Sequence, residues 1–135
     1  MANAFTLSIV APDRSVVETD VTTLIAPGAQ GYFGVLHGHL PMVAALKAGL
    51  IEYEDMQGQR HTVAVSGGFA EVTGAKVTIL ADAAERASEI DLARAEHALE
   101  EARKALRGES SGTTSREARQ ELERAMNRIR AAKGG

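Results

Sequence analysis

The C-terminal part of the sequence carries the residues best suited to binding an anion. Asp91 and Arg94 lie three residues apart, and Arg124 and Arg128 lie four apart, so each pair shares a face if its segment is helical. Folding the two helices antiparallel would bring the second pair back towards Arg94. Guanidinium groups have forked donors that match phosphate oxygens. Three guanidiniums together indicate a phosphate site, although a surface ion pair explains Asp91 and Arg94 taken alone.

The end of the chain is basic. No acidic residue follows Glu123, whereas four cationic residues do: Arg124, Arg128, Arg130 and Lys133. The helix dipole stabilises cations in the last turns, which accounts for the pattern without any partner. A second explanation is that these residues dock on an acidic surface of a partner.

His37 and His39 form a His-x-His pair, the opening of the metal-binding signature of cupins. That signature next needs a Glu three or four residues further on, where this chain has Val43 and Ala44. A His-x-His pair without a carboxylate is more often a loop feature than a metal site. The sequence has no P-loop, Ser-His-Asp order or Gly-x-Gly-x-x-Gly motif, so we expect no metal and no catalysis by this chain.

Two kinds of segment must position these residues. All five aromatic residues and all three prolines lie before residue 85, among β-branched residues and glycines. Apolar runs of strand length alternate there with turn residues, which favours an antiparallel β-sandwich or barrel. The expected strands are 5–9, 15–18, 21–26, 49–54, 60–66, 69–72 and 76–80. In the first of them, Phe5, Leu7 and Ile9 alternate with polar residues, as a half-buried strand requires.

After residue 85 the composition changes to Ala, Glu, Arg and Leu with helical spacing. Ser88, with Asp91 three residues later, predicts the start of a first helix that Gly108 ends. Thr114 and Glu117 predict the start of a second helix. Because the apolar seam of each helix is rich in alanine, we expect a helical hairpin that buries little apolar area and can move.

Composition limits the class of protein further. The chain has 135 residues, 44% hydrophobic residues, a net charge of −3 and no cysteine. These values predict a compact domain with an appendage, and they favour neither nucleic-acid binding nor thiolate chemistry. No apolar run is long enough to cross a bilayer, and we expect no N-terminal leader.

Two glycine-containing segments complete a specific combination, Gly34-Val35-Leu36-His37-Gly38-His39-Leu40-Pro41 and Val65-Ser66-Gly67-Gly68-Phe69-Ala70-Glu71-Val72. With these and the helical tail, nearly the full chain resembles the epsilon subunits of F-type ATP synthases. The resemblance implies an antiparallel β-sandwich of about ten strands in residues 1–86, followed by a regulatory two-helix antiparallel hairpin in 87–135.

The resemblance implies a rotor component that is not itself an enzyme. The sandwich would pack on the gamma subunit and on the ring of c subunits, coupling the catalytic head to proton-driven ATP synthesis. The helices would extend towards the alpha and beta subunits to inhibit ATP hydrolysis, with Arg124, Arg128, Arg130 and Lys133 as basic contacts. Membrane contact would be indirect, on the cytoplasmic side of a plasma membrane, and a bacterial source is favoured over a plastid.

The family also implies a regulatory ATP site, with no required cofactor. Members with an Ile/Leu-Asp-x-x-Arg-Ala motif bind ATP, and residues 90–95 match that motif. Glu101 departs from the pattern, because strong binders tend to have Arg there. The matching positions are Glu85, Ile90, Asp91, Arg94, Ala95, Arg124 and Arg128.

The segment that would face the c ring comprises Tyr32, His37, Gly38 and His39. His39 matches the family's histidine, whereas Tyr32 stands where Glu is common and could instead cover the edge of the sandwich. Two other functions stay open, a free nucleotide-sensing or adaptor protein of the same fold and a small cupin-like metalloenzyme.

Overall fold

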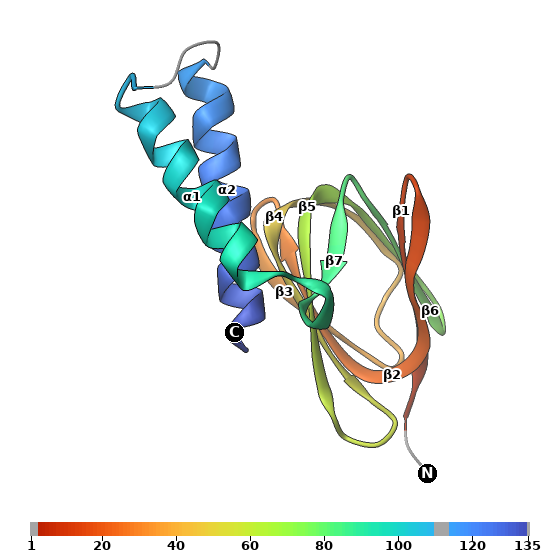
Figure 1. The fold of residues 1–135 in the computed structure, drawn as a ribbon. Helices are drawn as coiled ribbons and strands as arrows, with labels where there is room; N and C mark the ends of the chain where they lie inside the picture. The colour runs from red at the N-terminus through yellow and green to blue at the C-terminus, as the bar shows by residue number, and fades with distance from the viewer. Residues whose placement is uncertain (1–2, 110–113, 135) are drawn as a thin grey trace. The chain divides into compact units, whose positions relative to one another are not determined.

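The structure is a computed structural model that describes residues 3–109 and 114–134 (Figure 1). The chain divides into two compact units, Met1–Arg86 and Ala87–Gly135, which are described here in turn. No helix in the described residues combines the length and the apolar character needed to cross a membrane.

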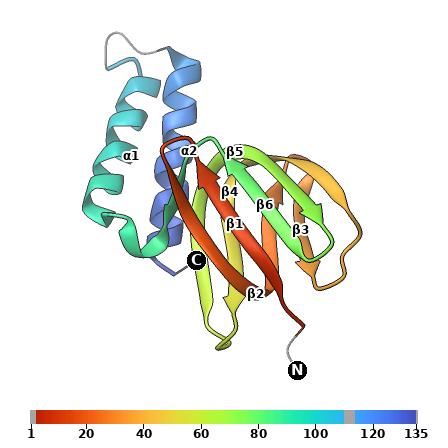
Figure 2. The same ribbon diagram turned by 90° about the vertical axis from the view of Figure 1, so that its right-hand side faces the viewer.

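The first unit is built from β-strands, as predicted. Its strands in the described residues are β1 (Phe5–Ala11), β2 (Arg14–Gly28), β3 (Gly31–Leu36), β4 (Met42–Asp55), β5 (Arg60–Thr73), β6 (Lys76–Ala81) and β7 (Ala84–Arg86). The strand order is β1-β6-β5-β4-β2-β3, and β1 also pairs with β2, so five strands close on themselves (Figure 2). The fold is therefore a sandwich with a barrel-like closure, to which β3 and β7 add edges.

The strands differ from the prediction in number and in one direction. The resemblance implied about ten strands, whereas the described residues form seven. Runs 15–18 and 21–26 are continuous in β2, runs 60–66 and 69–72 are continuous in β5, and β3 and β7 were not predicted from the residues. In β5, Gly67 and Gly68 adopt φ values of 122° and 133°, so the strand bends without ending. The pairing of β1 with β6 is parallel, whereas we expected antiparallel pairs throughout.

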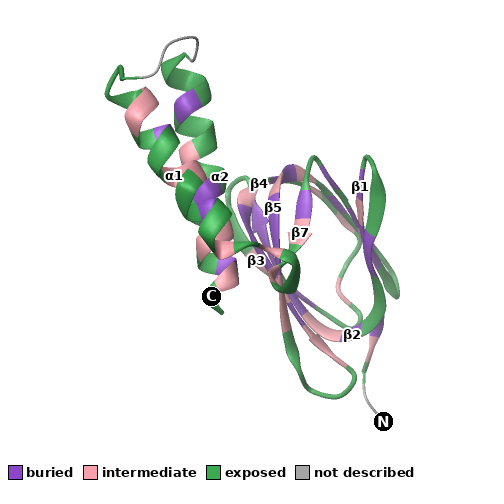
Figure 3. Cartoon of the chain, viewed as in Figure 1, coloured by how far each residue is buried: buried purple, intermediate pink, exposed green. Residues whose placement is uncertain are grey.

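The core contains the apolar residues that were predicted to face inward in the first strand. Phe5, Leu7 and Ile9 are buried, and they join a cluster that includes Leu24, Ile51 and other aliphatic side chains from every long strand (Figure 3). Burying one such side chain contributes roughly 1.5–3 kcal/mol. The β unit therefore has enough apolar contact to be stable as a body.

The second unit consists of η1 (Ala87–Glu89), α1 (Leu92–Leu106) and α2 (Ser115–Ala132). The predicted start of the first helix was wrong, because Ser88 lies in the 3-10 turn and Asp91 is the N-cap of α1. The second start was right: Thr114 and Glu117 form a capping box, with the Glu117 amide donating to Thr114 Oγ1 at 3.1 Å. Serine and aspartate have similar N-cap propensities, so the cap is the residue whose side-chain oxygen reaches the free amides, and here that residue is Asp91 rather than Ser88.

The two helices pack side by side as a hairpin, as predicted. The fully buried apolar residues of this unit are alanines: Ala95, Ala102, Ala118, Ala125 and Ala131. By contrast, Leu106 and Met126 are 37% and 44% exposed. An alanine contributes much less apolar area than a leucine, so the hairpin is less strongly held together than the β unit.

Candidate functional site

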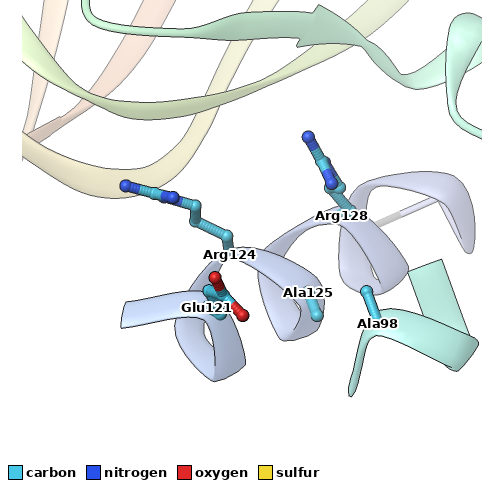
Figure 4. Close-up of a pocket in the computed structure, with 5 residues that line it drawn as sticks. All are labelled: Ala98, Glu121, Arg124, Ala125 and Arg128. Atoms are coloured by element: carbon cyan, nitrogen blue, oxygen red, sulfur yellow. The ribbon is translucent and has the colours of Figure 1, made fainter. Parts of the chain in front are cut away.

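A pocket of about 230 Å³ lies on the helical hairpin. Ala98 of α1 lines it, together with Glu121, Arg124, Ala125 and Arg128 of α2 (Figure 4). The positions in α2 are spaced three, four and seven residues from Glu121, so they fall on one face of the helix. Small side chains at 98 and 125 leave room between the helices for the longer polar ones.

The pocket has the charge of an anion site. Figure 4 shows Arg124 and Arg128 extending from the same side of α2. Arg124 is exposed, and it forms no hydrogen bond or ion pair with another residue in 3–109 or 114–134. Its forked donors are thus available to a ligand such as phosphate. The volume is below the roughly 300–1,000 Å³ of pockets that enclose drug-sized ligands, so it suits phosphates better than a whole nucleotide.

Of the predicted nucleotide residues, the structure brings Arg124 and Arg128 together. Asp91 and Arg94 do not line the pocket. Asp91 Oδ1 accepts a hydrogen bond of 3.1 Å from the backbone amide of Arg94, not from its guanidinium, so the surface ion pair that we considered is absent from the described residues. Arg94 is exposed.

The other motif residues have structural roles or lie elsewhere. Ala95 is buried, and the backbone amide of Ile90 donates to the Ala87 carbonyl at 3.2 Å. Glu85 belongs to β7 of the β unit, whereas the pocket is lined by the hairpin alone.

Glu101, expected to oppose phosphate, does not line the pocket. Its carboxylate lies 3.8 Å from Lys104 Nζ and 3.9 Å from His97 Nε2, on the surface of α1. The acidic residue that does line the pocket is Glu121, which the sequence analysis missed. The spacing Glu121-x-x-Arg124-x-x-x-Arg128 was the signal that could have found it.

The basic residues near the end of the chain do not all share one face. Arg130 follows Arg128 by two residues and is exposed in the last turn of α2. Lys133 is the C-cap, and its amide donates to the Ile129 carbonyl at 3.0 Å. These cations therefore lie where the helix dipole favours them.

The predicted ring-facing residues occupy two different places. Tyr32 lies in β3, and its hydroxyl accepts a hydrogen bond of 3.1 Å from the Leu50 amide of β4. A Cβ at Gly49 would lie 2.7 Å from the Tyr32 oxygen, so the glycine makes room for this contact. Although its side chain is partly exposed, Tyr32 thus covers the neighbouring strand, as in the alternative that we considered.

His37 and Gly38 form the exposed turn after β3, and Gly38 has a φ of 80°. His39 follows, with Nδ1 lying 2.7 Å from the Leu40 carbonyl oxygen. Because a carbonyl only accepts, this contact places a hydrogen on Nδ1, so Nε2 is the acceptor nitrogen when the ring is neutral. A cupin-like centre would need a further ligand, and residues 3–109 and 114–134 contain no group of three His, Cys, Asp or Glu placed to hold a metal.

A row of apolar residues, three of them exposed and Val10 partly buried, crosses the outer face of the β unit. Ala45, Phe69 and Leu80 are paired in register across β4, β5 and β6, and Val10 of β1 is paired with Leu80. Phe69 is 59% exposed and Leu80 is 57% exposed. We call these four residues the apolar row. Contiguous apolar residues on a sheet face are typical of a surface that another protein covers.

Comparison with known proteins matches the two units separately. Residues 4–87 match the family model described as "ATP synthase, Delta/Epsilon chain, beta-sandwich domain". Residues 88–133 match the model described as "ATP synthase, Delta/Epsilon chain, long alpha-helix domain". The class of protein defined by this fold is thus a β-sandwich carrying a helical hairpin, as in the non-catalytic delta and epsilon chains of ATP synthases.

Individual relatives agree over nearly the whole length. The chain is 41% identical to the ATP synthase epsilon chain of Desulforamulus reducens over 132 residues, 98% of this chain and 99% of the relative. It is 40% identical to that of Desulforapulum autotrophicum over 129 residues, 96% of each chain. The chain therefore belongs to the ATP synthase delta/epsilon family, which confirms the resemblance drawn from its motifs.

Solved structures show the same fold. A chain of the Euglena gracilis mitochondrial ATP synthase, in a structure of OSCP, F1 and the c-ring, superposes with a TM-score of 0.77 at 27% identity. The match covers 98% of this chain and 82% of that one. A chain from the central stalk and c-ring of the Tetrahymena thermophila enzyme has a TM-score of 0.58 at 10% identity, which supports the fold alone.

Proposed function

We propose that this chain is a central-stalk subunit of an F-type ATP synthase, coupling the catalytic head to the c ring during proton-driven ATP synthesis. The observation that carries the proposal is the match of 41% identity over 98% of the chain to an ATP synthase epsilon chain. A stalk subunit transmits force through contacts with its neighbours and needs no catalytic group of its own.

The β unit is the part that binds the rotor. Its closed strand arrangement and aliphatic core suit a body that must keep its shape under load. The apolar row offers a surface for the gamma subunit, and the exposed turn at His37 and Gly38, with Nε2 of His39, offers polar contacts to the c ring. The subunit would then be peripheral to the cytoplasmic face of a bacterial plasma membrane and reach it through the ring.

The helical hairpin is the regulatory part. Because its buried residues are mainly alanines, separating the two helices from each other costs little free energy. In an extended form, Arg124, Arg128, Arg130 and Lys133 would meet acidic segments of the alpha and beta subunits and block ATP hydrolysis. In the folded form, the phosphates of ATP would occupy the hairpin pocket, and the bound nucleotide would oppose extension.

The pocket supports ATP as a regulatory ligand through its two arginines, which suit phosphates. Asp91 and Arg94, which are exposed on the hairpin but do not line this pocket, would contribute to the rest of the nucleotide site. Glu101 would not oppose the phosphates directly, since its carboxylate lies near Lys104.

The stalk assignment is tested by expressing the chain with its own gamma subunit and c ring. We expect the full chain, and a truncation lacking residues 88–135, to co-purify with both partners. We also expect an assembled head that contains the truncated chain to hydrolyse ATP faster than one that contains the full chain. A chain that binds neither gamma nor the ring would be a free adaptor instead. Unchanged hydrolysis after truncation would overturn the inhibitory role and leave the stalk role standing.

A further inference from the structure

An acidic side chain, Glu121, lies in the pocket that Arg124 and Arg128 line. Along the helix axis it precedes Arg124 by about 4.5 Å and Arg128 by about 10.5 Å, from the rise of 1.5 Å per residue. It forms no hydrogen bond or ion pair with another described residue. Its carboxylate is therefore open to a ligand, and position 121 lies on the same helical face as positions 124 and 128.

The other acids of α2 are placed differently. Glu117 is engaged in the capping box, where its carboxylate accepts from the Thr114 amide. Glu123 is exposed, does not line the pocket and lies about 200° around the helix from Glu121. Glu121 is thus the acid of α2 that a ligand held by the two arginines would meet.

A carboxylate that lines the same pocket as two arginines has two opposite effects on a phosphate ligand. It repels the phosphate charge, which weakens binding of any polyphosphate. It also accepts hydrogen bonds, so it favours a ligand that presents hydroxyl or amino donors next to its phosphates. An inorganic polyphosphate suffers the repulsion without the compensating hydrogen bond.

We propose that Glu121 is the specificity-determining residue of this pocket, selecting phosphate esters that carry hydrogen-bond donors, such as nucleotides, over inorganic polyphosphate. The inference rests on the proposed function of the pocket as a phosphate site. It assigns to Glu121 the discrimination, and to Arg124 and Arg128 the affinity.

The test is calorimetric titration of ATP and of inorganic tripolyphosphate, at low salt, into the full wild-type chain, Glu121→Gln and Glu123→Gln. We expect Glu121→Gln to bind tripolyphosphate roughly three- to tenfold more tightly, the range for one nearby, partly screened charge. ATP binding should change less, because a lost hydrogen bond offsets the lost repulsion. The quantity compared is the ratio of the dissociation constants for tripolyphosphate and ATP. Glu123→Gln removes the same charge outside the pocket and should keep the wild-type value of this ratio.

The outcomes separate this inference from the proposed ATP site. If wild type binds ATP and the ratio is the same in Glu121→Gln, or shifts equally in Glu123→Gln, the role of Glu121 is wrong and the ATP site stands. If wild type binds no ATP but Glu121→Gln gains tripolyphosphate binding, the ATP ligand is wrong and the role of Glu121 in opposing bare polyphosphate stands. If neither protein binds either compound, both are wrong.

Discussion

Asp91 caps α1 by accepting a hydrogen bond from the backbone amide of Arg94, at 3.1 Å. These are the two charged residues of the motif that indicated an anion site. The contact joins the carboxylate to the helix backbone rather than to the guanidinium, so Arg94 is not neutralised by its neighbour. The motif therefore has a structural role in starting the helix, whatever ligand the hairpin binds.

Replacing Asp91 separates its structural role from a role in ligand binding. We expect Asp91→Ala to destabilise the hairpin by about 1 kcal/mol, because the amide of Arg94 loses its cap. Asp91→Asn should keep the cap, since asparagine is equally good there. Amide hydrogen exchange in α1 checks both. If Asp91→Asn retains protection but loses ATP binding, the carboxylate has a ligand role as well.

The arginine pair gives a second prediction. Arg124→Ala should weaken binding of tripolyphosphate by about tenfold, because a charge-assisted hydrogen bond contributes roughly 1.5 kcal/mol or more. Arg124→Lys should recover only part of the affinity, since lysine lacks the fork. Arg119→Ala removes an exposed cation of α2 outside the pocket and serves as the control. Equal losses in Arg119→Ala and Arg124→Ala would mean that binding is non-specific attraction to the helix.

The turn that joins β4 to β5 predicts that the stability of the β unit depends on pH. A hydrogen bond from His61, together with those from the Gln59 and Gln57 amides, lowers the pKa of Asp55. A carboxylate whose pKa is lowered on folding stabilises the fold above its unfolded value of about 3.9, and that contribution is lost as pH falls through the folded pKa.

We therefore expect wild type to lose stability between about pH 5 and pH 2 more steeply than Asp55→Asn, in denaturant midpoints measured across that range. Asp13→Asn, in the turn between β1 and β2, controls for removing one acidic charge. Parallel curves for wild type and Asp55→Asn would show that the turn does not contribute to acid sensitivity.

The bend in β5 depends on Gly68. A Cβ there would collide with the Leu80 carbonyl oxygen and lie 2.9 Å from Ala81 Cα, at a φ of 133°. We expect Gly68→Ala to cost several kcal/mol of unfolding free energy, measured by urea denaturation. Gly58→Ala, at a φ of 80° with no atom nearer than 4.0 Å, should cost only about 1 kcal/mol of backbone strain. Similar costs at both positions would mean that β5 can shift away from β6.

The accuracy of each prediction from sequence depended on how local its cause was. The alternation of Phe5, Leu7 and Ile9 and the capping box of Thr114 and Glu117 were recognisable because the interacting residues are close along the chain. The start of α1 was misplaced at Ser88, since several nearby polar residues can cap, and Asp91 is the one whose side chain accepts from the Arg94 amide. Glu121 was missed because the pocket that it lines forms only where Ala98 of α1 meets α2.

The sequence by itself determined the two-part architecture, the family and the pair of arginines on one helix face, because composition, periodicity and motif spacing are properties of short segments. The tertiary structure decided the parallel pairing of β1 with β6, the continuity of β5 through Gly67 and Gly68, and the pocket in which Ala98 of α1 meets Arg124 and Arg128 of α2. Those features join residues that are distant in the chain or need a particular backbone bend. Their energies come from packing and electrostatics between segments, which no single segment encodes.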